Sequence, residues 1–84
     1  MRYTVRLKSS ADRGLGKLPR ELQGRILAKL DQLAENPHLP GTEKLHGEPG
    51  YRVRVGDYRI VYDILHQEVT ILVIRIGHRR EVYR

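Results

Sequence analysis

The first residues alternate between apolar and polar side chains, which is the period of a strand with one buried face. In residues 2–8, Tyr3, Val5 and Leu7 fall on one face and four polar side chains fall on the other. The pattern predicts a half-buried strand at the start of the chain.

A first helix is predicted directly after this strand. Ser9 and Ser10 offer capping oxygens to a helix that begins near Ala11, and Gly14 and Gly16 weaken it a few residues later. The helix should therefore be short.

A second helix is predicted from apolar residues at helical spacing. Pro19 suits its first turn, and Asn36-Pro37 stops it. The apolar stripe consists of Leu22, Ile26, Leu30 and Leu33. Two helices in succession, the second with such a stripe, predict a helical hairpin.

The second half of the chain begins with a predicted loop and continues as strands. Residues 37–50 hold three of the four prolines and three glycines, which is typical of a loop. Residues 51–55 and 58–64 flank Gly56-Asp57, a two-residue turn, and residues 69–76 are apolar on both faces, as in a central strand.

These elements predict one α+β domain over residues 1–84. The order strand, helix, helix, strand, strand, strand favours a sandwich in which one antiparallel sheet carries the helical hairpin on one face. The chain has no cysteine, which excludes disulfides and fits a reducing cytoplasm. The longest apolar run is Ile71 to Ile74, so we expect no membrane span.

Charge adds a first indication of the partner. Lys and Arg number 16 against 10 Asp and Glu, and the net charge of +6 suits a polyanion. A two-residue turn at Gly56-Asp57 would pair residue 54 with 59 and put Arg52, Arg54 and Arg59 on one face. Like charges directly opposed destabilise a sheet, so a bridging anion would explain the arrangement. A solvated sheet face that simply carries arginines is the alternative.

The face of the last strand depends on the loop at residues 65–68. A loop with an even number of residues and one with an odd number place Arg75 on opposite sides of the sheet, and we expect the odd register. Arg75 then lies on the face of Arg59, where Val61 and Val73 form an apolar strip. The same register leaves Leu72, Ile74 and Ile76 for the core.

The remaining candidate chemistry is concentrated at the C-terminus. Residues 77–84 contain His78, three arginines and Tyr83, and a frayed basic tail is the alternative interpretation. The four histidines have no metal-ligand spacing, so we expect no metal site.

The segment YRVRVGDYRIVY at residues 51–62, followed by IGHRREVY at residues 76–83, resembles RelE toxins of the RelE/ParE toxin-antitoxin superfamily. The resemblance covers nearly the whole chain, including the LHG stretch at residues 45–47. It implies a small RelE-like sandwich that acts as a ribosome-dependent endoribonuclease on messenger RNA in the A site. It also implies a cognate RelB-like antitoxin, which we expect to be acidic, and no cofactor.

The resemblance assigns catalytic roles to five residues, namely Arg52, Arg54, Arg59, Arg79 and Tyr83. Many members have lysine at the first pair, and arginine is a poor proton donor or acceptor. The arginines would hold the charge of a phosphorane formed by 2′-OH attack without a metal, and Tyr83 would stack on a base or assist proton transfer. Together with Arg52 and Arg54, Arg75 and Arg80 are expected to bind RNA.

His78 as the general base is our own inference and is not implied by the family. Imidazole exchanges protons near neutral pH, and neighbouring cations should keep His78 neutral and able to accept one.

Two other functions remain open. A ParE-like toxin would inhibit DNA gyrase by binding, and a non-catalytic RNA-binding module would only contact phosphates. A tyrosine placed beside the cationic cluster argues against both, because binding alone does not need Tyr83.

Overall fold

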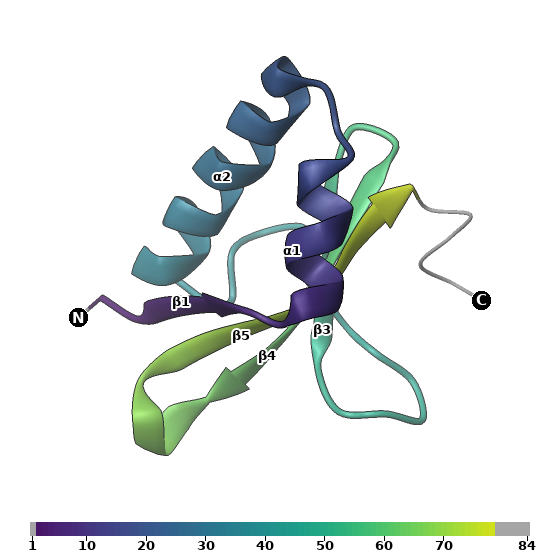
Figure 1. Cartoon of the computed structure of the whole chain (residues 1–84). Helices are drawn as coiled ribbons and strands as arrows, with labels where there is room; N and C mark the ends of the chain where they lie inside the picture. The colour runs from purple at the N-terminus through teal and green to yellow at the C-terminus, as the bar shows by residue number, and fades with distance from the viewer. Residues whose placement is uncertain (1, 79–84) are drawn as a thin grey trace.

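A five-stranded sheet with two helices on one face makes up the computed structural model, which describes residues 2–78 (Figure 1). The elements in chain order are β1 (Thr4–Leu7), α1 (Ser9–Gly16), α2 (Arg20–Glu35), β2 (Glu43–Lys44), β3 (Tyr51–Val55), β4 (Tyr58–Leu65), a 3-10 turn η1 (His66–Glu68) and β5 (Thr70–His78). The sheet order is β1-β5-β4-β3-β2. The predicted α+β sandwich is confirmed.

The sheet is mixed, whereas we predicted an antiparallel one. Strands β2 to β5 are antiparallel neighbours, but β1 runs parallel to β5, from Thr4 opposite Thr70 to Leu7 opposite Val73. Alternation along a strand shows which face is buried and says nothing about the direction of its neighbour. β2 lies inside the predicted loop, and two residues are too few to show a strand period.

The first helix starts two residues earlier than predicted. Its N-cap position is Lys8, which makes no side-chain cap hydrogen bond. Ser9 and Ser10 lie inside the helix, so their predicted capping role is wrong. The Ser10 hydroxyl instead donates a hydrogen bond to the carbonyl oxygen of Ile74 in β5, at 2.7 Å.

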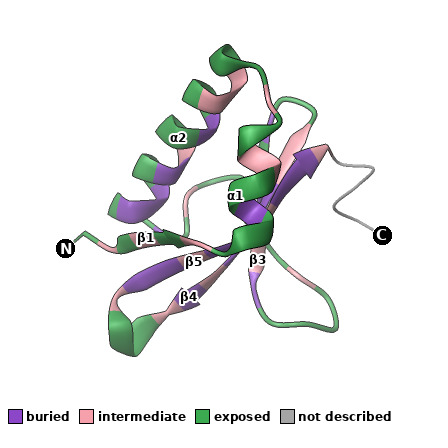
Figure 2. Ribbon diagram, in the orientation of Figure 1, coloured by how far each residue is buried: buried purple, intermediate pink, exposed green. Residues whose placement is uncertain are grey.

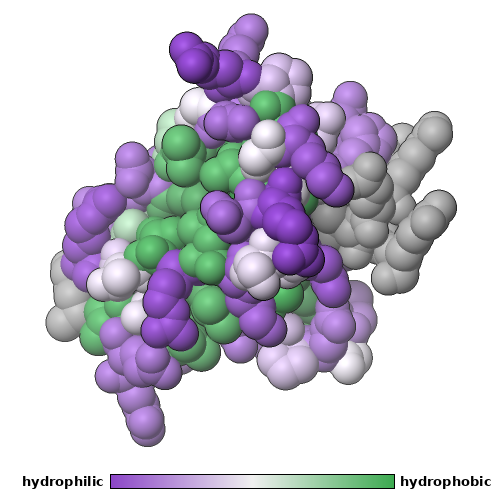
Figure 3. Space-filling model, viewed as in Figure 1, coloured by the Kyte–Doolittle hydropathy of each residue, from purple (hydrophilic) through white to green (hydrophobic). Residues whose placement is uncertain are grey.

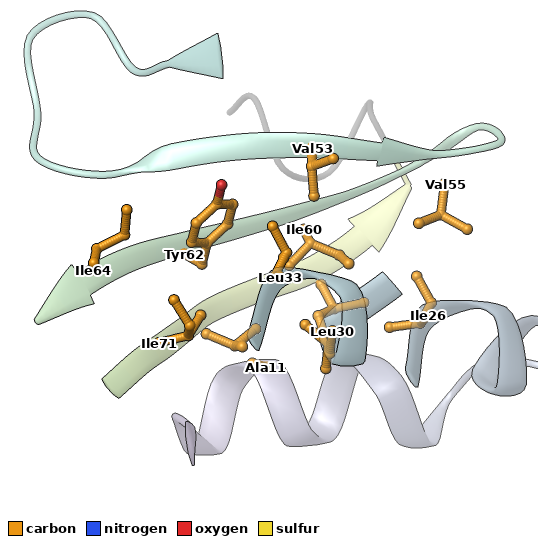
Figure 4. Packing of buried hydrophobic residues seen from close by; sticks show 12 residues of the cluster. Ala11, Ile26, Leu30, Leu33, Val53, Val55, Ile60, Tyr62, Ile64 and Ile71 are labelled. Atoms are coloured by element: carbon orange, nitrogen blue, oxygen red, sulfur yellow. The ribbon is translucent and has the colours of Figure 1, made fainter. Parts of the chain in front are cut away.

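The second helix and the core agree with the apolar pattern. α2 begins directly after Pro19 and ends before Asn36, and its inward residues pack on the strands. Buried positions line the facing sides of helices and sheet (Figures 2 and 4). Ile26, Leu30 and Leu33 of α2 belong to this cluster. On the helix side, apolar side chains reach the surface between α1 and α2 (Figure 3).

A β-bulge between Val61 and Tyr62 changes the register of β5 halfway along. Toward the chain end, Val61 lies opposite Arg75, as the odd register requires, so Arg75 is on the predicted face. On the other side of the bulge, nearer η1, Tyr62 lies opposite Val73. Because the bulge adds one residue, the side chains of this part of β5 lie on the face opposite to the predicted one.

The bulge overturns part of the predicted core. Val73 is fully buried on the helix side, so it does not join Val61 in an apolar strip. Leu72 and Ile74 are only partly buried and line a groove with Val61 on the opposite face. Ile76 belongs to the core, as predicted.

Neither helix within residues 2–78 is long and apolar enough to cross a membrane.

Candidate functional site

The hairpin of β3 and β4 collects arginines on the sheet face turned away from the helices. The backbone φ of Gly56 is +60°, which glycine adopts readily in a tight turn. The register is as predicted, with Arg52 opposite Val61 and Arg54 opposite Arg59. We call this surface the arginine face; it carries Arg52, Arg54, Arg59 and Arg75.

On the hairpin, Arg52 and Arg59 contact neighbouring polar groups. Arg52 Nε lies 3.5 Å from Glu43 Oε1, and the Arg52 side chain is only 29% exposed. Arg59 Nη1 donates a hydrogen bond to the Tyr58 carbonyl at 3.2 Å. Glu43 was not predicted to take part, because the short strand that carries it showed no pattern.

Arg75 joins the arginine face from β5. Its Nη2 lies 3.5 Å from Glu48 Oε1, and its Nε is buried with no hydrogen-bond partner among residues 2–78. An unpaired buried donor costs free energy, roughly 1–3 kcal/mol, so this position is not optimised for stability. The contact of Glu48 was not predicted either, since a loop sequence does not indicate which strand the loop crosses.

A groove of about 310 Å³ adjoins Arg75 on this face. It is lined by Lys8, Glu48, Pro49, Val61, Asp63, Leu72, Ile74 and Arg75. The groove combines an apolar floor with charges of both signs, whereas the pairing of Arg54 with Arg59 brings two cations together.

His78 does not lie with the arginines. It pairs directly with Tyr58, and the two rings meet edge to face with centroids 5.5 Å apart. Directly opposed residues share a face, and Tyr58 packs against the core on the helix side. The structure therefore places His78 on the opposite face from Arg59, and its role as a base stays a prediction.

The other predicted site residues, Arg79, Arg80 and Tyr83, lie outside the described residues. Within residues 2–78, His, Asp and Glu side chains form no cluster of three that could hold a metal ion.

Comparison with known proteins identifies the family. The model of the family described as ParE toxin of type II toxin-antitoxin system, parDE, matches residues 5–83. Toxin RelG of Mycobacterium tuberculosis is 31% identical, with 100% of this chain and 99% of that protein covered. The mRNA interferase toxin RelE of Escherichia coli is 30% identical, with 99% and 92% covered.

Solved structures agree with the sequence relatives. A chain in the crystal structure of the toxin-antitoxin complex RelBE2 from Mycobacterium tuberculosis superposes with a TM-score of 0.83 at 30% identity, covering 94% of this chain and all of that one. The fold is thus that of a small toxin found in a toxin-antitoxin complex. The chain belongs to the RelE/ParE superfamily of toxins from type II toxin-antitoxin systems.

Proposed function

We propose that this toxin is a ribosome-dependent endoribonuclease that cuts messenger RNA in the A site and so inhibits translation. The observation that carries the proposal is the direct pairing of Arg54 with Arg59 on a face that also bears Arg52 and Arg75. Similarity to proteins named mRNA interferase supports it.

The inventory of side chains suits cleavage by the 2′-OH of the RNA. The attack builds a phosphorane with additional negative charge, and guanidinium groups bind such oxygens through two parallel hydrogen bonds. In this proposal Arg52 and Arg54 position the phosphate, and Arg59 with Arg79 holds the charge of the transition state. Tyr83 stacks on a base or assists the proton transfer.

A cognate antitoxin is the second partner in this proposal. The related RelBE2 structure is a toxin-antitoxin complex, and a surface with this excess of positive charge favours an acidic segment. Because ribosomes are the proposed site of action, we expect the protein to work in the cytoplasm.

The decisive experiment maps the ends of messenger RNA by primer extension after the toxin is induced. We expect cuts within translated codons, and with purified components we expect cutting only on translating ribosomes, leaving a 2′,3′-cyclic phosphate and a 5′-OH. Cutting of naked RNA would refute ribosome dependence, and 5′-phosphate ends would refute 2′-OH attack.

The matching family model is described as a ParE toxin, which makes gyrase inhibition the second candidate. A supercoiling assay run alongside separates the two functions. Inhibited supercoiling together with intact messenger RNA would replace the nuclease proposal by the ParE-like one.

A further inference from the structure

A basic pocket lies where α1 covers the edge of β5. β1 pairs with β5 only over residues 70–73, so β5 continues beyond the end of β1, and α1 packs against this continuation (Figure 1). The hydrogen bond from Ser10 to the carbonyl of Ile74 fastens the helix there.

Gly14 lets α1 approach the strand closely. A Cβ atom at this position would overlap with the carbonyl oxygen of Ile76. The close approach places Arg13 of α1 and the C-cap residue Lys17 near the last residues of β5, and both of these residues line the pocket.

The pocket has a volume of about 400 Å³ and a strongly cationic lining. The lining residues are Ser10, Arg13, Gly14, Lys17, Leu18, Tyr58, Arg75, Ile76, Gly77 and His78. Three of them are permanent cations and one is a histidine. Among the residues that the structure describes, 2–78, no Asp or Glu lines it.

Arg13 lies in the last turn of α1 and Lys17 is its C-cap residue, and this end of a helix favours cations. The two residues are four positions apart, and like charges at this spacing repel each other by about 0.2–0.5 kcal/mol. Within residues 2–78, neither forms an ion pair with a carboxylate. An anion that binds between them offsets this repulsion.

The pocket is continuous with the arginine face. Arg75 lines both this pocket and the groove beside Val61. The paired positions Arg54, Arg59 and Gly77 also form a row across three strands, and Gly77 belongs to the pocket lining. A chain of phosphates that lies on the arginine face can therefore continue around the edge of β5 into the pocket.

We propose that this pocket binds the phosphodiester backbone of RNA as a second contact beside the arginine face, with Arg13 and Lys17 as phosphate ligands. The identity of the ligand as RNA rests on the proposed function. Messenger RNA and ribosomal RNA have the same phosphodiester backbone. We propose that the phosphates in the pocket belong to the messenger RNA.

The test compares two double variants that lose equal charge. Arg13→Gln with Lys17→Gln removes two of the three permanent cations of the pocket, and Arg20→Gln with Arg25→Gln removes two exposed cations of α2 outside the pocket. Each protein is titrated into a short unstructured RNA with blocked 2′-OH groups, and anisotropy is followed at several salt concentrations. The slope of log K against log salt should fall by about 1.4 for the pocket pair, since single strands lose about 0.7 per phosphate contact.

Binding to ribosomes without messenger RNA distinguishes the two RNA sources. A deficit of the pocket pair confined to ribosomes would retain the RNA site and assign it to ribosomal RNA. If the two double variants lose equal affinity in both binding assays, or if neither loses affinity in either assay, the site is overturned. Amide chemical shifts on RNA addition give a second readout, and unchanged shifts at residues 10–17 would also overturn it.

Failure of this inference and of the proposed function are distinguishable, because the binding assay requires no cleavage. Wild-type protein that binds RNA through the pocket and leaves messenger RNA intact on ribosomes would refute only the nuclease. Pocket variants that bind and cut like the control pair would refute only the pocket.

Discussion

Arg54 and Arg59 face each other across β3 and β4 on a sheet surface without a carboxylate in the same pair. Opposed like charges typically destabilise a sheet by a few tenths of a kcal/mol up to about 1 kcal/mol. A phosphate held between the two guanidinium groups reverses the sign of this interaction. In the proposed complex, the same pair would form the binding site of the phosphate.

Arg59→Ala should lower cleavage on ribosomes by at least about 100-fold, the loss typical of one charge-stabilising donor. Ribosome affinity should fall much less if Arg59 acts mainly on the transition state. Single-turnover cleavage and ribosome binding measure the two effects. Arg6→Ala removes an exposed arginine of β1 as the control and should leave the rate unchanged. Equal losses in rate and affinity would make Arg59 a phosphate anchor only.

Tyr62 is fully buried, and its hydroxyl donates a hydrogen bond to the Pro37 carbonyl at 2.7 Å. Burial raises the pKa of Tyr62 from 10.0 to about 12, because the phenolate would lose its hydration. A raised pKa in the folded state means that the contribution to stability is complete below pH 10 and is lost as the pH rises toward 12.

The unfolding free energy should therefore drop by about 2–3 kcal/mol between these pH values, at about 1.4 kcal/mol per pKa unit. Urea unfolding of wild type and Tyr62→Phe across this range measures the drop. The variant should lose this part of the pH dependence, and identical pH profiles of the two proteins would show that Tyr62 titrates normally.

His78 provides a test of side-chain placement. Loss of a general base costs about 100-fold or more in rate. Since the ring meets Tyr58 on the opposite face from Arg59, we expect His78→Gln to lower cleavage by less than about tenfold. Cleavage rates on ribosomes decide the question. A 100-fold loss with an intact fold would support the prediction that His78 is the base.

The packing of α1 on β5 depends on the absence of a side chain at position 14. Gly14→Ala would force a Cβ atom against the Ile76 carbonyl, and overpacking of this kind costs about 1–3 kcal/mol. Gly24 has nothing within 4 Å of its Cβ direction and lies in the interior of α2, so Gly24→Ala should stabilise by about 1 kcal/mol. Urea unfolding compares the two variants, and stabilisation by both would refute the close contact.

The sequence was most informative where local rules decide the structure. The turn at Gly56-Asp57 and the alternation around it were sufficient to pair Arg54 with Arg59 correctly. The bulge at Val61 was not predictable, because residues on both faces of β5 are apolar and either register buries a similar surface.

Contacts between segments that are distant in the sequence could not be predicted either. The carbonyl of Ile74 that receives the Ser10 hydrogen bond, and the carboxylates of Glu43 and Glu48, depend on the path of the loops and on the position of α1. A serine before an apolar stripe is more often a cap, so the local rule for Ser10 was overridden by tertiary packing.

At the scale of the whole molecule, the helices and the arginine face lie on opposite sides of one sheet. Buried side chains of the helices and of the sheet form the core between them (Figure 2). The other side of the sheet carries the arginine face. With a net charge of +6 and one side this basic, the protein should attract polyanions over long distances.

The cognate antitoxin should therefore associate at a rate that depends strongly on salt. We expect an acidic segment to cover Arg52, Arg54 and Arg59, since an inhibitor of the proposed nuclease has to block these guanidinium groups. Stopped-flow association at low and high salt should show the rate falling by 10-fold or more, within the range of about 10–10³ for electrostatic steering. An association rate independent of salt would contradict steering. An inhibitory complex in which the three arginines stay accessible to solvent would show that the antitoxin acts elsewhere on the toxin.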